Sequence, residues 1–147
     1  MKMKKTIYAA IVAATVLATA CDLETSDNGD LDGFWHLERV DTLDNGNYAD
    51  LSSKKLFWAF QMHMMSVRDQ GANKSSFWLR FNHKGDSLLV SDPYYNVRVP
   101  DDKKVEDTNV LAPFGISGLS DGYLVEKLNG SKMRLKSKTL RLYFTKF

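Results

Sequence analysis

The chain of 147 residues has one cysteine and three histidines, and this scarcity narrows its chemistry. A single cysteine excludes an intramolecular disulfide, so a hydrophobic core has to stabilise the fold. His36, His63 and His83 do not pair with one another, or with the cysteine, at a metal-ligand spacing. A phosphate-binding glycine loop and a Gly-x-Ser-x-Gly nucleophile elbow are also missing. We therefore expect no enzyme, no metal and no cofactor.

The sequence also lacks an apolar run long enough to span a membrane as a helix. The run from Ile7 to Ala20 is shorter than the roughly 20 residues that a bilayer requires. Basic residues precede it, and the small residues 18–20 separate it from Cys21. A basic start, a short apolar core and small residues before a cleavage site are typical of a secretory signal peptide.

This N-terminus resembles the signal of bacterial lipoproteins, in which small residues precede a cysteine that receives the lipid. The resemblance implies that residues 1–20 are removed and that Cys21 carries acyl chains. Two or more such chains are enough to hold a protein stably on a membrane. The alternative is ordinary secretion, with Cys21 trimmed away or left as a spare thiol.

The mature chain has no excess of positive charge. Three of the 20 Lys and Arg residues belong to the predicted signal, which leaves 17 against 18 Asp and Glu. This balance argues against nucleic acid as a partner. Residues 21–30 are polar and acidic, and they predict a flexible tether. They also resemble the acidic stretch of surface-displayed lipoproteins of Bacteroides-type bacteria, although a plain spacer is equally consistent. We expect an envelope protein on the outer membrane, facing the periplasm or the surface.

The remaining residues, 31–147, predict one all-β domain. Short stretches of alternating polarity are separated by glycine-containing turns, and no stretch has a sustained helical period. Asn129-Gly130 predicts a hairpin with a type I′ turn. About eight strands suit a single antiparallel up-and-down β-barrel, which has no free edges; an open sheet or a sandwich is the alternative. The predicted strands are 33–42, 54–67, 76–83, 87–90, 94–99, 123–128, 131–136 and 139–147.

One motif indicates a family. Gly33-Phe34-Trp35, at the start of the first predicted strand, resembles the lipocalin and wider calycin signature. The C-terminal residues 140–147 are similar to the ends of small lipocalin-like lipoproteins of gut Bacteroidetes. The resemblance implies that Trp35 closes the barrel base and that an arginine of the last strand packs over it. Arg141 is the first candidate for this arginine, and Arg134 is the second.

Aromatic and thioether side chains suggest where a ligand could bind. They alternate along the predicted strand 54–67, and Trp78 is expected on a neighbouring strand. Such a stripe forms either core or the wall of an apolar pocket. The irregular segment 110–120 is expected to cover one end of the fold with Phe114, Ile116 and Leu119. The candidate lining residues are Trp58, Phe60, Met62, Met64 and Trp78.

Two functions follow from these observations. The first is a membrane-anchored lipoprotein whose lipocalin-like domain binds a small apolar ligand. The alternative is a non-enzymatic interaction or structural lipoprotein, with a filled barrel and an envelope protein bound at its open-end loops. The interior of the barrel distinguishes them, because only the first needs a pocket there.

Overall fold

The computed structural model describes residues 26–97 and 103–147. The predicted signal peptide, Cys21 and the first tether residues lie outside the described residues. Within these ranges the chain forms nine strands and three short 3-10 helices. The helices are η1 (Gly29–Leu31), η2 (Thr108–Val110) and η3 (Ala112–Phe114). The strands are β1 (Gly33–Thr42), β2 (Tyr48–Asp50), β3 (Leu56–Gln61), β4 (Met64–Asp69), β5 (Ser76–Lys84), β6 (Ser87–Tyr95), β7 (Ser120–Leu128), β8 (Lys132–Lys136) and β9 (Leu140–Lys146).

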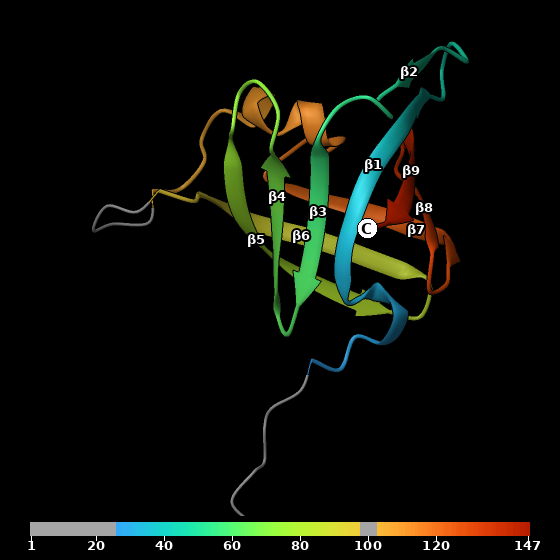
Figure 1. The fold of residues 1–147 in the computed structure, drawn as a ribbon, viewed down its shortest axis with the longest axis horizontal. Helices are drawn as coiled ribbons and strands as arrows, with labels where there is room; N and C mark the ends of the chain where they lie inside the picture. The colour runs from blue at the N-terminus through green and yellow to red at the C-terminus, as the bar shows by residue number, and fades with distance from the viewer. Residues whose placement is uncertain (1–25, 98–102) are drawn as a thin grey trace, which may run out of the picture.

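Eight of these strands close into a barrel. Every pairing is antiparallel, and the order from β3 to β9 follows the chain. Strand β1 pairs with β3 on one side and with β9 on the other, which completes the ring (Figure 1). Strand β2 pairs only with the distal part of β1. The predicted all-β, up-and-down barrel is confirmed.

Two predicted boundaries are wrong, and the errors compensate in the strand count. The stretch 54–67 is not one strand but the hairpin β3–β4, whose turn holds Met62 at a φ of 54°. Conversely, the stretches 87–90 and 94–99 share the continuous strand β6, since Tyr94 and Tyr95 belong to it. Asp92, at a φ of 51°, and Pro93 form a bulge opposite β5, which lets β6 continue past a proline.

A bulge in β1 also changes which residues face inward. Leu37 pairs with Phe144 and Arg39 with Tyr143, so Glu38 is an extra residue in the strand. Strict alternation would place Arg39 on the same face as buried Leu37. The bulge instead turns Arg39 outward and lets Val40 pack against the core.

The two ends of the barrel differ. Helix η1 and the β3–β4 turn lie at one end, which we call the N-terminal end (Figure 1). Helices η2 and η3 and strand β2 lie at the opposite end, which we call the mouth. The tether was predicted to run to residue 30, but Ser26 and Asn28 already hydrogen-bond to Met62. Their polar side chains satisfy the backbone of the turn, so the folded part begins before residue 31.

Candidate functional site

A segment of the chain itself fills the barrel at the mouth. Residues 111–116, which we call the plug, contribute three fully buried side chains, Leu111, Phe114 and Ile116. The Trp58 indole Nε1 donates a buried hydrogen bond of 3.1 Å to the Phe114 carbonyl oxygen. The plug is therefore held from inside the barrel by polar as well as apolar contacts.

A second hydrogen bond holds the plug from the opposite wall. The Tyr123 hydroxyl donates to the Gly115 carbonyl oxygen at 2.8 Å. Burial raises the pKa of Tyr123 well above its ordinary value, so the hydroxyl stays protonated and remains a donor. The expectation that this segment covers one end of the fold is confirmed for Phe114 and Ile116. Leu119 does not take part, because 45% of its surface is exposed.

The predicted ligand-lining residues do not form a pocket inside the barrel. Trp58 and Phe60 are buried in the core, where Trp58 packs against Phe144 with ring centroids 5.1 Å apart. Met62 lies in the β3–β4 turn and Met64 begins β4, and each exposes 38% of its surface. The predicted single strand placed all four on one face, but the turn at Met62 reverses the chain and breaks that alternation.

Trp78 lies on the outer wall rather than in the interior. It pairs with Tyr94 across β5 and β6, and both are half-buried. Together with Met64 and the charged Arg80 and Asp92 they line a depression of about 450 Å³. The structure thus brings Met64 and Trp78 together, as the sequence suggested, but on the outside of the barrel. The prediction of an internal apolar pocket lined by these residues is wrong.

The cation over Trp35 is a lysine. Lys146 Nζ lies 4.9 Å from the centroid of the buried Trp35 ring, and it donates to the Asp30 carbonyl oxygen at 3.0 Å. A Cβ on Gly33 would stand 2.9 Å from Lys146 Cε. The glycine of the Gly-x-Trp motif therefore leaves room for this lysine beside the tryptophan.

Arg141, the predicted partner of Trp35, is bound elsewhere. Its guanidinium donates to both carboxylate oxygens of Glu126, at 2.7 and 3.2 Å, on the outer wall. These hydrogen bonds lower the pKa of Glu126. Arg134, the second candidate, lies 3.4 Å from the same carboxylate. Both arginines alternate outward from the core residues of their strands, so neither can reach Trp35 inside.

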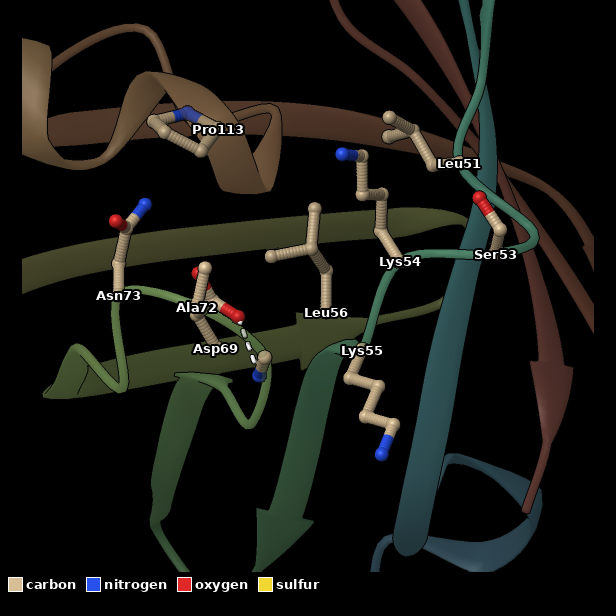
Figure 2. Close-up of a pocket in the computed structure, with 10 residues that line it drawn as sticks. Leu51, Ser53, Lys54, Lys55, Leu56, Asp69, Ala72, Asn73 and Pro113 are labelled. Carbon is tan, nitrogen blue, oxygen red and sulfur yellow. Dashed lines mark hydrogen bonds between the residues drawn. The ribbon is translucent and has the colours of Figure 1, made fainter.

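Beside the plug, the mouth carries a pocket of about 430 Å³. Figure 2 shows Leu56 at its centre, Pro113 of the plug above and the β4–β5 loop on the left. Lys54 points the same way as Leu56, whereas the side chain of Lys55 points the opposite way. The residues that line the pocket are Leu51, Ser53, Lys54, Lys55, Leu56, Asp69, Gly71, Ala72, Asn73 and Pro113.

Three charged side chains line this mouth pocket, Lys54, Lys55 and Asp69, and their formal charges sum to +1. Asp69 accepts a hydrogen bond of 2.7 Å from the Gly71 backbone N–H, which orders the β4–β5 loop (Figure 2). No ion pair engages Lys54 within the ranges that the structure describes. The pocket therefore combines an apolar floor, Leu56 and Pro113, with a lysine at its edge. Sequence reasoning missed it because its residues come from three segments with no shared motif.

The described residues show neither a metal site nor a membrane-spanning helix. They contain no group of three or more His, Cys, Asp or Glu side chains arranged to hold a metal ion. Nor do they form any helix with the length and hydrophobicity needed to cross a bilayer.

The eight-stranded barrel, with a buried tryptophan at the start of its first strand, defines a lipocalin-type protein. The chain belongs to the lipocalin-like domain family, because residues 15–147 match the model of that family. The solved structure of a lipocalin-like protein from Bacteroides uniformis is similar, with 23% identity and a TM-score of 0.62, over 81% of this chain and 100% of that one. An uncharacterized protein from Bacteroides eggerthii is 18% identical, with a TM-score of 0.59, over 80% and 99%. No curated protein matches the chain.

Proposed function

We propose that this chain is a lipid-anchored envelope protein whose lipocalin-like domain binds a small, mainly apolar ligand without catalysis. The mouth pocket carries the proposal. The plug occupies the interior, and the adjoining pocket of about 430 Å³ lies within the size range of small-molecule sites. A ligand would lie against Leu56 and Pro113.

The charge at the rim narrows the chemistry of the ligand. Lys54 offers an ammonium group above the apolar floor, and no described carboxylate neutralises it. A carboxylate or phosphate on an apolar body would therefore be favoured over a neutral analogue. Fatty acids of medium length and retinoic acid are suitable probes.

We base the proposed acylation of Cys21 on the resemblance of the N-terminus to bacterial lipoprotein signals. An acylated Cys21 would hold the protein on the outer membrane, on its periplasmic or surface face. Mass spectrometry of the membrane-extracted protein should find an acylated N-terminal cysteine. Cys21→Ala should release the protein from membranes or stall its processing. A variant that is fully processed and still membrane-bound would contradict lipidation at this residue.

The ligand is tested by native mass spectrometry of the protein purified from its own host, and then by titration with the acidic probes. Lys54→Met should weaken the binding of an acidic probe roughly tenfold, because it removes the charged partner. Lys138→Met is the matched control, since Lys138 is exposed in the turn between β8 and β9 and does not line the pocket, and this variant should bind as the parent does. An unliganded native mass together with no binding of any probe would contradict the proposal.

The second candidate is an interaction lipoprotein whose mouth binds another envelope protein. The filled interior favours it, because a lipocalin-type barrel that acts through its loops needs no cavity. Tyr48 of β2, with 63% of its surface exposed at the mouth, is a suitable anchor for a partner. Cross-linking in the host envelope, with Tyr48→Ala as the variant that should lose the product, distinguishes this function from ligand binding.

A further inference from the structure

The N-terminal segment leaves the barrel at a fixed point. Ser26 Oγ accepts a hydrogen bond of 2.7 Å from the Met62 backbone N–H, and Asn28 Nδ2 donates to the Met62 carbonyl oxygen at 2.9 Å. Asp32 accepts from Ser26 Oγ at 2.6 Å and from the Asn28 backbone N–H at 2.9 Å. The chain toward Cys21 therefore starts beside the β3–β4 turn.

The distance from this point to Cys21 is bounded by chain length. An extended chain spans at most about 3.6 Å per residue, so Cys21 cannot lie more than about 18 Å from Ser26. Strands of nine residues, such as β5 and β6, are about 30 Å long at ~3.3 Å per residue, and tilt in a barrel shortens this to roughly 23 Å along the axis. The tether is too short to let the mouth face a membrane to which Cys21 is anchored.

The N-terminal end also exposes apolar side chains. Met62, whose backbone in the turn binds Ser26, and Met64, the first residue of β4, each expose 38% of their surface. Phe147 exposes 84% and ends an outer aromatic cluster, but it lies on the barrel wall at about mid-height rather than at this end (Figure 1). Its ring centroid is 6.0 Å from that of Phe34 and 5.5 Å from that of Phe57. The backbone N–H of Phe147 donates to the Phe34 carbonyl oxygen at 2.8 Å, which fixes the cluster beside the start of β1.

We propose that this end of the barrel rests on the lipid bilayer, with Met62 and Met64 inserted into the interfacial region. The inference depends on the proposed acylation of Cys21, which supplies the anchor. Inserting these side chains is favoured because their apolar surface leaves water for the interfacial layer. The mouth pocket then faces away from the membrane.

The contact is apolar rather than electrostatic. Exposed charges of both signs lie at this end, in the turns and η1, including Lys84, Asp86, Lys132 and Asp30. Their opposite signs produce no net attraction to anionic lipids. We therefore expect the contact to persist at high salt, where screening removes surface electrostatics.

Single introduced cysteines test this contact. Acylation blocks Cys21, so an added cysteine is the only reactive thiol in the mature chain. Met62→Cys and Met64→Cys place a probe at the N-terminal end, and Lys138→Cys, in the exposed turn between β8 and β9, is the matched control at the mouth. Each lipidated variant is labelled with an NBD fluorophore in vesicles of phosphatidylethanolamine and phosphatidylglycerol, with and without doxyl-labelled lipid.

The probes at residues 62 and 64 should emit at shorter wavelength and be quenched by doxyl lipid at least about twofold more than the probe at residue 138. Equal quenching at all three positions, in protein that sediments with the vesicles, would overturn the proposed orientation and leave the anchor intact. Protein that does not sediment would show that the Cys21 anchor has failed, and the orientation would then fail with it. Similar quenching of the probes at residues 62 and 64 would show that the result does not come from a local distortion of the turn at Met62.

Discussion

Gly115 occupies the most constrained backbone position of the plug. Its φ is 77°, and a Cβ would stand 2.5 Å from Leu142 Cδ2 in β9. The residue must therefore adopt a left-handed conformation and also let the plug approach the opposite wall. Both requirements are met by glycine, because it has no Cβ.

We predict that Gly115→Ala lowers the free energy of unfolding by about 2–4 kcal/mol, since it adds left-handed strain to a steric clash. Urea denaturation at neutral pH measures the difference. Gly130→Ala is the control, because a Cβ there meets nothing within 4 Å and its φ lies outside the left-handed range. Equal effects of the two substitutions would contradict the role assigned to Gly115.

Glu126 and Arg141 connect β7 to β9 across the outer wall, and their ion pair predicts a dependence of stability on pH. The hydrogen bond from Arg141 lowers the pKa of Glu126 below its ordinary value of 4.5. The folded chain therefore binds this proton less readily than the unfolded chain. The stabilisation is complete above the ordinary pKa and is lost as pH falls through the lowered pKa.

Glu126→Gln should cost about 1 kcal/mol at neutral pH, and the difference from the parent should shrink steadily below pH 4.5. Urea unfolding at several pH values measures this difference. Glu106→Gln, at an exposed position, should follow the parent at every pH. If the difference in free energy of unfolding between the parent and Glu126→Gln stays constant as the pH falls below 4.5, the carboxylate charge of Glu126 does not contribute to stability.

The plug is the element that decides whether the barrel has an interior cavity. Phe114 is fully buried, with its ring centroid 6.0 Å from that of Phe77. We predict that Phe114→Ala destabilises the chain by about 3–5 kcal/mol and opens an apolar cavity large enough for benzene. Leu119→Ala, at a position 45% exposed, should change stability by no more than about 0.5 kcal/mol.

Denaturation and benzene titration measure the two effects of Phe114→Ala. Phe114→Leu keeps most of the volume, so it serves as a folded variant if the alanine variant does not fold. A stable alanine variant that binds no benzene would show that the plug collapses inward and closes the cavity.

The hairpin β7–β8 was predicted correctly, but the conformation of its turn differs from the predicted one. The hairpin at Asn129-Gly130 is confirmed, but neither residue has a positive φ, so the predicted type I′ turn is wrong. Asn129 Oδ1 instead accepts hydrogen bonds from the backbone N–H groups of Ser131 and Lys132. Because the side chain satisfies these donors, the backbone does not need the left-handed conformation.

For the molecule as a whole, the proposed orientation separates the anchor from the mouth pocket. With the N-terminal end on the bilayer, the mouth should be as accessible in the anchored protein as in the free one. We predict that an acidic probe binds the lipidated protein in nanodiscs with a Kd within about twofold of that of the Cys21→Ala protein in solution. Empty nanodiscs provide the control for partition of the probe into lipid. Binding that is tenfold weaker in nanodiscs would indicate that the membrane covers the mouth.

The predicted strand pattern is most reliable where the inward residues alternate without interruption. In β9, Leu142 and Phe144 are buried, as the alternation predicted. The alternation fails where a strand contains an extra residue, or where a turn lacks the residues that usually mark one. Glu38 adds a bulge that carries no composition signal, and Met62 turns the chain without the glycine or asparagine that marks most tight turns.

The all-β class and the approximate strand count can be derived from the order of residues alone, because alternation and turn chemistry are local properties of neighbouring residues. The proposal of a lipid anchor rests on a contiguous signal for the same reason. What fills the barrel, and which cation packs over Trp35, depend on residues far apart in the chain. Trp58 meets Phe114 across 56 positions, and Lys146 reaches Asp30 across 116. Barrel closure decides these contacts, since pairing β1 with β9 sets the register that turns Arg141 outward and leaves Lys146 beside the tryptophan.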